Sequence, residues 1–312
     1  MTRETLIRET REVLAKAGFY LSDENVMRMI CFDLVARRDN ILVILKILSN
    51  VDSFTKYKAQ ELITVSNMLS GSPVLIGEHN SSKRIEPGII YLRYGIPMLN
   101  SKTLGDFFLE GVPPLIFSAP GGFYVNIDGN ALRDAREDKG VSLGTLAEVA
   151  GVSRKSIQMY ENGMSTVIEI ALRLEEYLKI PLIKSLDPFS FLKDVDNINI
   201  EFNKPEKDGG DIFSQLRALG YDVVPTVHCP FDALTKDKKV LIITGISDYD
   251  KKTAVKARIL TNLSKITEQY SVIFLEKEVS KENLEGTPII QKAELEKMDD
   301  SDEIITLISE RS

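Results

Sequence analysis

The sequence has no tryptophan and, among its 312 residues, only two cysteines and two histidines. Cys31 and Cys229 lie far apart in the chain, as do His79 and His228, so the usual four-ligand zinc pattern is missing. We therefore expect no disulfide and no structural metal, and we assign no metal ligand and no cofactor. These four side chains are expected to be ordinary loop or core residues.

Long apolar runs are also missing. No window approaches the roughly 18 consecutive apolar residues that span a bilayer, and the first residues are charged and amphipathic, unlike a signal peptide. We expect a soluble cytoplasmic protein with no membrane partner. The hydrophobic fraction of 43% excludes a disordered chain, and the net charge of -7 excludes one that coats nucleic acid by bulk charge. A local basic surface remains compatible with this charge.

Hydrophobic patterning predicts a mixed α/β region before about residue 127. A helix over 1–20 precedes a hairpin of 27–36 and 41–48, and the second strand of this hairpin is apolar on both faces. A helix over 56–70 and short strands at 73–77, 88–91 and 94–98 follow. From Asp128 the pattern becomes purely helical. At about 100–200 residues per domain, the length allows two or three domains.

A diverged internal repeat surrounds this helical stretch. Phe32-Asp33, a basic turn and an apolar strand recur as Phe231-Asp232, a basic turn and an apolar strand. Further pairs keep the same order: Lys58-Ala59 with Lys256-Ala257, Val74–Ile76 with Val272–Phe274, Gly95–Met98 with Gly286–Ile289, and Gly18-Phe19-Tyr20 with Gly220-Tyr221. Matches in one order at a nearly constant offset favour duplication over chance.

The helical stretch has the spacing of a helix-turn-helix. The first helix covers Asn130 to Lys139, and Ser142 and Ser153 are positioned to cap the second and third helices. Small Ala147 allows close helix approach, Gly151 takes the tight turn, and Ile157 fills the angle between the two helices.

The solvent side of the third helix carries Arg154, Lys155, Ser156 and Gln158, with no acidic residue before Glu161. Arginine pairs with guanine and glutamine with adenine, while lysine and serine contact phosphate or base. We therefore predict double-stranded DNA as the partner. The predicted contact residues, within the segment Leu143 to Asn162, are Ser142, Ser153, Arg154, Lys155, Ser156 and Gln158. Because residues 130–184 carry eight basic and eight acidic groups, a monomer would bind weakly, and a homodimer on a palindrome is expected.

The run GVSLGTLAEVAGVSRKSIQMYENG resembles the Cro and phage-repressor (XRE-like) class of helix-turn-helix. With Leu109–Pro114 and Ala119–Gly122 before it, the whole arrangement resembles the archaeal family of "putative HTH-type transcriptional regulatory proteins". One position departs from the class. Many members carry a phosphate-holding glutamine where this chain has Leu143.

The repeated α/β region resembles the restriction-endonuclease-like fold, in which an Asp, then an acid or Gln two residues before a Lys, hold Mg²⁺. Asp33 and Lys46 match, but the acid position is Ile44. In the second copy only Asp232 remains, with Ile243 and Gly245 at the other positions. Metal-assisted hydrolysis needs at least two oxygen ligands. In the first copy, Glu24 or Gln60 would have to supply the ligand that is missing at Ile44. We expect both copies to be degenerate, with no catalytic residues.

The predicted fold class is therefore α/β plus all-α, with two related restriction-endonuclease-like domains flanking a five-helix Cro/repressor-type domain. The predicted parts are an α/β domain at 1–127, a helix-turn-helix domain at 128–187, a linker at 188–210 and a second α/β domain at 211–312. The function expected is sequence-specific transcriptional regulation without catalysis. A Mg²⁺-dependent nuclease targeted by the helix-turn-helix and a protein-interaction adaptor are the alternatives. The sequence names neither an operator nor an effector.

Overall fold

The computed structural model describes residues 2–23, 31–189, 210–238 and 240–312. Most of the predicted linker 188–210, the start of the predicted first hairpin strand and Glu24 lie outside these residues. The chain divides into two compact units that interleave along the sequence. The first unit contains Met1–Val13, Leu48–Asp52 and Val74–Asp196, and the second contains Leu14–Ile47, Ser53–Pro73 and Asn197–Ser312. Parts of the predicted 1–127 domain fall in both units, so the domain boundaries stay a prediction.

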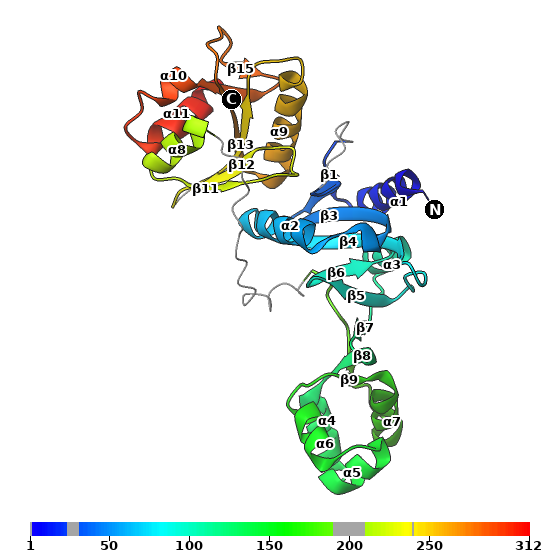
Figure 1. The fold of residues 1–312 in the computed structure, drawn as a ribbon. Coiled ribbons are helices and arrows are strands. Elements are labelled where there is room, and N and C mark those ends of the chain that lie inside the picture. Colours follow the sequence, from blue (N-terminus) through cyan, green and yellow to red (C-terminus); the bar gives the residue numbers. More distant parts are fainter. Residues whose placement is uncertain (1, 24–30, 190–209, 239) are drawn as a thin grey trace. The chain divides into compact units, whose positions relative to one another are not determined.

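The segment before residue 128 alternates helices and strands as the hydrophobic pattern predicts. Figure 1 follows its elements along the chain. They are α1 (Arg3–Lys16), β1 (Tyr20–Leu21), β2 (Leu34–Arg38), β3 (Ile41–Asn50), the 3-10 turn Val51–Ser53, α2 (Lys56–Met68), β4 (Ser72–His79), β5 (Ile89–Arg93), β6 (Ile96–Leu99), α3 (Ser101–Leu109), β7 (Ile116–Ala119) and β8 (Gly122–Ile127). Polar caps fix two helix starts, because Thr55 and Asn100 accept the backbone N–H groups of Lys58 and Thr103.

The middle segment has four helices where five were expected. They are α4 (Gly129–Asp138), α5 (Leu143–Ala150), α6 (Arg154–Glu161) and α7 (Ile168–Leu178). α7 ends with the C-cap residue Lys179, whose backbone is left-handed (φ 58°), and β10 (Ile183–Lys184) then pairs antiparallel with β8 in place of a further helix. The two-residue strand β9 (Thr166–Val167) pairs with the same β8. The five-helix prediction was therefore wrong for this segment, which adds short strands to its helices.

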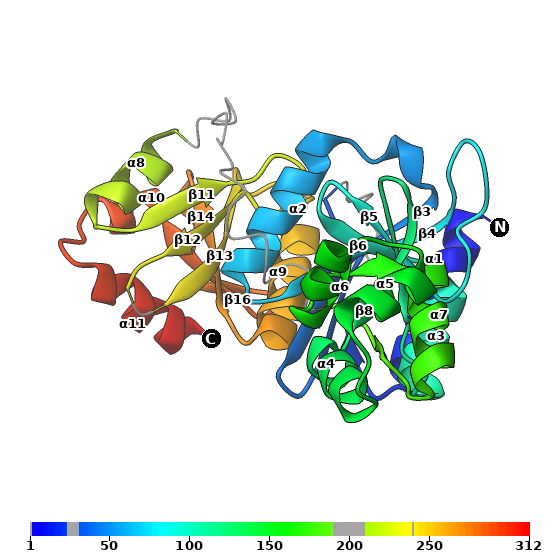
Figure 2. The same cartoon turned by 90° about the horizontal axis from the view of Figure 1, so that it is seen from below.

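The third segment is a sheet with helices on both sides. Its elements are α8 (Gly210–Ala218), β11 (Asp222–Pro225), β12 (Ala233–Lys236), β13 (Leu241–Ser247), α9 (Thr253–Thr267), β14 (Tyr270–Leu275), β15 (Asn283–Leu284), β16 (Thr287–Gln291), α10 (Lys292–Leu295) and α11 (Ser301–Arg311). Figures 1 and 2 show α9 on one side of the strands and α8, α10 and α11 on the other. The helices on that second side bury Ile212, Phe213, Leu216, Ile304 and Ile308 against the sheet.

Strand order is the same in the two predicted copies. β1, β2 and β3 pair antiparallel in sequence order, as do β11, β12 and β13. β4 runs parallel to β6, which pairs antiparallel with β5; likewise β14 runs parallel to β16, which pairs antiparallel with β15. Each copy thus combines a meander with a parallel crossover, and the crossover explains why most residues of β13 and β14 are buried.

Equivalent aspartates make equivalent backbone bonds in the two copies. The Asp33 N–H donates to Leu45 O (2.8 Å), and its Oδ2 accepts from Ile47 N (2.7 Å). The Asp232 N–H donates to Thr244 O (2.9 Å), and its Oδ2 accepts from Ile246 N (2.7 Å). The offset of 199 residues between these positions is the one in the sequence pattern. Both aspartates therefore tie the start of one strand to the middle of the next.

Within the second unit, one contact between the two copies joins equivalent positions, and polar contacts lie beside it. The rings of Phe32 and Phe231, which match in the repeat, lie with centroids 6.5 Å apart and are both buried. Arg37 forms an ion pair with Glu268 at the end of α9, and Asp23 N donates to Asn262 Oδ1 (3.0 Å). An aromatic centre flanked by polar contacts is the usual organisation of a specific protein interface.

Candidate nucleic-acid interface

The turn between α5 and α6 has the local geometry that the sequence predicts. Ser142 Oγ accepts from Thr145 N and Ser153 Oγ from Ser156 N, each at 3.0 Å, so both serines cap their helices. Gly151 ends α5 with φ at 73°, a left-handed conformation that favours glycine. The Val152 N–H then donates to Ala147 O (2.9 Å). These bonds fix the angle at which α6 leaves α5.

A small core holds the two helices in this geometry. Ile157 and Leu146 are fully buried and Ala147 is 4% exposed, in a cluster with Ala150 and Leu174. α5 packs against both α6 and α7. Arg173 on α7 adds a polar contact, because its Nη1 donates to Ala150 O (3.2 Å) at the carboxyl end of α5. Ala147 and Ile157 therefore lie where the spacing predicted them.

The outer side of α6 presents most of the predicted contact residues to solvent. Ser142, Ser153, Arg154, Lys155 and Gln158 are exposed, and Ser156 is half-buried. Within the described part of the chain, Arg154, Lys155 and Gln158 make no side-chain hydrogen bond or ion pair. The Arg154 guanidinium lies against the first turn of α5, where a Cβ on Gly144 would come within 2.9 Å of it. Gly144 thus leaves room for Arg154, a relation that the sequence did not indicate.

Glu161, the first acidic residue of α6, points inward. Its side chain is 6% exposed, and Arg136 on α4 donates to it through Nε (2.5 Å) and Nη2 (3.3 Å). Arg133 Nε lies 3.6 Å away, and the bond to Glu161 holds the pKa of Arg136 above its ordinary value. Glu175 also turns inward, accepting from Leu182 N and Ile183 N. Residues 130–184 carry equal numbers of acidic and basic groups, but these two acids point inward. The surface of α6 is therefore less acidic than the count suggests.

A polar groove of about 510 Å³ lies beside this ion pair, between the start of α4 and the end of α6. Its walls include Asn126, Asn130, Arg133, Asn162 and Lys184, and Lys184 pairs with Asp128 at 3.1 Å. Arg133 Nη2 bonds Asn162 Oδ1 at 3.1 Å.

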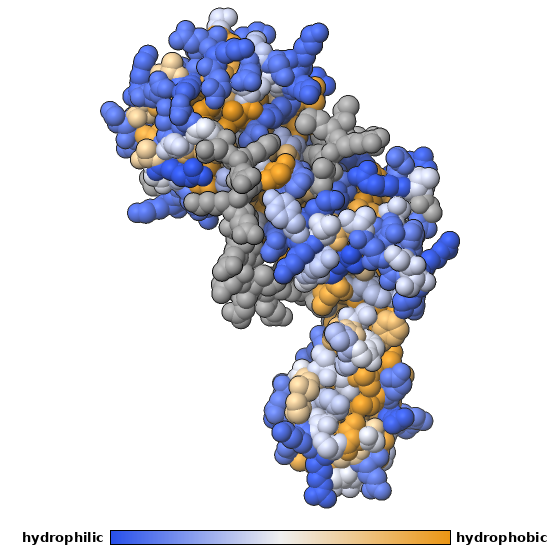
Figure 3. Space-filling model, viewed as in Figure 1, coloured by the Kyte–Doolittle hydropathy of each residue, from blue (hydrophilic) through white to orange (hydrophobic). Residues whose placement is uncertain are grey.

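In the space-filling view of Figure 3, apolar and polar surface alternate over the module that contains α4 to α7. The exposed large apolar side chains there are Met164, Leu172 and Tyr177.

Gly129 is required where α4 meets the end of α6. A Cβ at this position would lie 2.5 Å from Glu161 O and 2.7 Å from Tyr160 O, and backbone atoms cannot move aside like a flexible side chain. We expect Gly129→Ala to lower the free energy of unfolding by about 1–3 kcal/mol, the usual cost of overpacking. Urea unfolding measures the loss. Asn130→Ala, on the exposed neighbouring position, is the control, and an equal stability of both variants would contradict the close approach.

The two nuclease-like positions hold ion pairs of different construction. Asp33 Oδ1 lies 3.2 Å from Lys46 Nζ, and their side chains are 4% and 6% exposed. Asp232 has no strand lysine; instead Lys256 on α9 donates from Nζ to Asp232 Oδ2 (2.5 Å) and to Ile246 O (2.7 Å). A Cβ on Gly245 would lie 2.8 Å from Leu260 Cδ1, so the glycine allows α9 to pack closely on β13. Each aspartate is therefore paired with a lysine, and among the described residues neither belongs to a group of three or more metal-ligating side chains.

Gln60, one of the two residues considered for completing the metal site, lies on α2 and is half-buried. Among the described residues, three metal-ligating side chains come together at Cys31, Glu61 and Cys229, a grouping that the sequence did not suggest. No described helix is both long and apolar enough to cross a membrane.

The geometry of α4 to α7 defines a helix-turn-helix protein, and comparison with family models agrees. A helix-turn-helix model matches residues 132–184. A second model, of the PD-(D/E)XK superfamily domain, matches residues 3–114. The mixed α/β fold with a PD-(D/E)XK-like N-terminal part and a helix-turn-helix region is thereby confirmed.

Curated relatives match along the full chain. A protein of Methanococcoides burtonii is 40% identical over 100% of this chain and 98% of its own length. Relatives from Methanocella arvoryzae and Halobacterium salinarum are 38% and 35% identical, over 97% and 98% of their lengths. The printed name of all three contains "Putative HTH-type transcriptional regulatory protein". The chain belongs to this archaeal family, as its sequence motifs indicated.

Proposed function

We propose that this protein is a sequence-specific DNA-binding transcriptional regulator that contacts the major groove with α6. One observation carries the proposal: Arg154, Lys155 and Gln158 are exposed together on a helix whose only acid, Glu161, is buried against Arg136. A helix with this presentation offers donors to base edges and phosphates without repelling the duplex. The names of the full-length relatives support the same function.

Different roles follow for the predicted contact residues. Arg154 and Gln158 have the chemistry for guanine and adenine, while Lys155 suits phosphate. Ser142 and Ser153 are exposed caps at helix N-termini, where backbone N–H groups favour a phosphate oxygen. Ser156, half-buried and bonded to Ser153 Oγ at 2.9 Å, is the least accessible member of the set. These assignments stay proposals, as does the 128–187 boundary of the DNA-binding domain.

We further propose that a homodimer is the active form. One α6 offers two cationic side chains, which is few for tight binding, and a twofold dimer would double the phosphate and base contacts on a palindrome. Met164, Leu172 and Tyr177 supply exposed apolar surface in the same segment. Because its proposed ligand is chromosomal DNA, the protein would act in the cytoplasm. An effector is not assigned.

The second candidate function is Mg²⁺-dependent DNA cleavage, favoured by the PD-(D/E)XK match and by the Asp33–Lys46 pair. One position argues against it. The residue at the acid position, two residues before Lys46, is the fully buried Ile44, which has no oxygen to offer. A Mg²⁺ ion needs several oxygen ligands in octahedral geometry. We therefore propose that the two α/β copies retain the nuclease fold without its Mg²⁺-dependent cleavage activity. Their role would be in assembly of the protein.

Selection of bound DNA from a random pool, with Mg²⁺ present and recovered strands sized, tests both functions. Intact strands with a palindromic consensus are expected. Cut strands whose formation requires Asp33, as tested with Asp33→Ala, would establish the nuclease. No enrichment at all would overturn DNA binding and would favour the protein-interaction adaptor instead.

Variants of α6 sharpen the test. Arg154→Ala is expected to weaken binding to the selected site by about 1–3 kcal/mol per half-site and to relax specificity at one base pair. Lys155→Ala should weaken binding to all sequences alike and reduce the salt slope by about one per contact. Lys102→Ala, which removes an exposed lysine of α3, is the matched control. Equal losses in all three variants would contradict a specific role for α6.

A further inference from the structure

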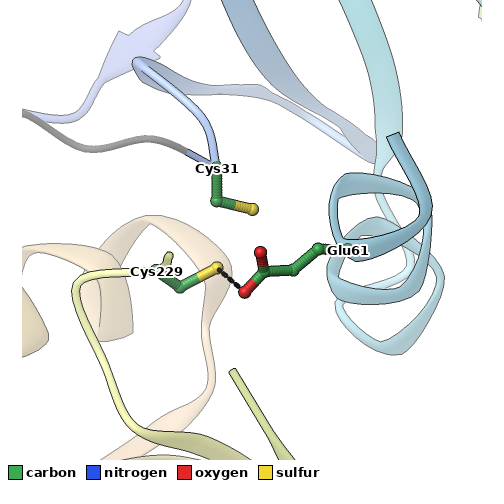
Figure 4. Close-up of side chains that lie close together, drawn as sticks. All are labelled: Cys31, Glu61 and Cys229. Carbon is green, nitrogen blue, oxygen red and sulfur yellow. Dashed lines mark hydrogen bonds between the residues drawn. The ribbon is translucent and has the colours of Figure 1, made fainter. Parts of the chain in front are cut away.

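Cys31 and Cys229, almost 200 residues apart in sequence, come together in the second unit beside a buried glutamate. One ligand atom from each of Cys31, Glu61 and Cys229 lies within 4.8 Å of the others. Cys31 is fully buried, Glu61 is 8% exposed and Cys229 is half-buried. Figure 4 shows the two thiols side by side with the carboxylate of Glu61 directed at them. Elsewhere in the described ranges no second group of this kind occurs.

The backbone holds all three side chains in place. Cys31 precedes β2, Glu61 is on α2, and Cys229 lies in the loop between β11 and β12. Glu61 Oε1 accepts from Val227 N (2.8 Å) and His228 N (3.0 Å), and Cys31 N donates to His228 O (3.2 Å). His228 Nδ1 lies 2.9 Å from Glu61 Oε2, and its ring packs edge-on against Tyr57. The carboxylate is therefore oriented by contacts outside the cluster, as the ligands of metal sites are.

We propose that Cys31, Cys229 and Glu61 bind one thiophilic divalent cation such as Zn²⁺, with His228 as the positioning residue for Glu61. Two sulfurs and one carboxylate oxygen are ligands that Zn²⁺ accepts, and ligand atoms within 4.8 Å of one another need only contract slightly to surround one ion. On binding, both thiols lose their protons to solvent and water completes a four-coordinate site. This departs from the sequence expectation of no metal, which rested on the small number of cysteines and histidines and on their separation in the sequence.

The alternative for two neighbouring thiols is a disulfide, and the third member of the cluster argues against it. A disulfide sulfur carries no proton to donate to a carboxylate, yet Cys229 Sγ donates to Glu61 Oε1 at 3.7 Å. A bound cation would tie the loops of both α/β copies to α2.

The test uses the full chain, kept reduced by a phosphine that does not itself carry thiols. Zn²⁺ is titrated against a chromophoric chelator, and Co²⁺ is then added as a spectroscopic substitute. We expect one ion per chain, a thiolate-to-cobalt charge-transfer band and the strong visible bands of a tetrahedral site. Because these spectra come from the wild-type chain, they decide the question even if a variant does not fold.

Variants then assign the ligands. Cys31→Ser and Cys229→Ser should each remove the charge-transfer contribution of one sulfur from the cobalt spectrum. Each should weaken Zn²⁺ binding at least as much as a variant of the positioning residue His228 does. That variant, His228→Asn, should weaken binding by about 10–100-fold while leaving both sulfur contributions in the cobalt spectrum. Glu61→Gln should weaken binding too. Glu268→Gln, which removes a different carboxylate between the two copies, is the matched control and should bind normally.

Three results would overturn the site. They are failure of the reduced chain to bind Zn²⁺, binding that survives both serine variants, and a cobalt spectrum without thiolate charge transfer. Failure to bind Zn²⁺ combined with a mass lower by two hydrogens after air oxidation would instead assign the pair to a disulfide.

Discussion

Replacing Glu161 with alanine is expected to destabilise the helix-turn-helix by about 3 kcal/mol, the lower end for a broken buried ion pair, because the mostly buried Arg136 then keeps only the exposed Glu137 as its carboxylate partner. Arg136 is 13% exposed and its Nε bonds Glu161 at 2.5 Å, while Nη1 bonds Val141 O at 3.3 Å. The same contact joins α4 to α6, so the loss should reach the DNA-contacting surface. Hydrogen exchange of the amides in residues 129–161 measures the effect where it arises, without relying on unfolding of the whole chain.

Glu148→Ala is the control for this experiment, since Glu148 is an exposed acid of α5 in the same segment. It should change amide protection little and should leave DNA binding intact or slightly stronger. Wild-type protection in Glu161→Ala would mean that Arg136 finds another partner, and the role given to the pair would then be wrong. Glu161→Gln, which can still accept a hydrogen bond, should fall between the two.

Phe231→Ala is expected to cost about 3–5 kcal/mol of unfolding free energy and to loosen the contact between the two α/β copies. Phe231 is 2% exposed and its ring lies 6.5 Å from that of Phe32 in a tilted arrangement. A double-mutant cycle with Phe32→Ala isolates the contact. We expect a coupling of about 0.5–1.5 kcal/mol in urea unfolding, the range for aromatic pairs.

The matched control for this cycle is Phe274→Ala. Phe274 is 1% exposed in the core of the second copy, so its single-variant cost should be similar, but it should be additive with Phe32→Ala. Additivity of Phe231→Ala with Phe32→Ala would show that the two rings contribute to separate cores, and the contact would carry no energy of its own.

Local sequence was enough to predict the helix-turn-helix. Ser142, Gly151 and Ser153 act on backbone groups within three or four residues, so their roles follow from spacing. The extra helix was predicted wrongly because the partner of β10 is β8, more than 50 residues earlier. A segment that pairs over such a distance carries no local signal for it.

Long-range electrostatic contacts were also beyond the sequence. Glu161 looked like a solvent-facing acid, and only its position opposite Arg136 shows that it is buried. In the second copy, Lys256 on α9 takes the role that Lys46 on β3 has in the first copy. Alignment of the repeat therefore showed no cation beside Asp232. The meeting of Cys31 with Cys229 depends on how two copies pack, which neither copy encodes alone.

The contact of Phe32 with Phe231 has a consequence for how this chain evolved. A contact between two equivalent residues is typical of a symmetric dimer, so we infer that a duplication turned an association between molecules into one within a single gene product. Each half could then change without its mirror image changing too. Pro230 stands at the repeat position of Cys31, and Ile259 at that of Glu61. Fusion thus permits a single asymmetric cluster where an unfused pair would have had to carry two.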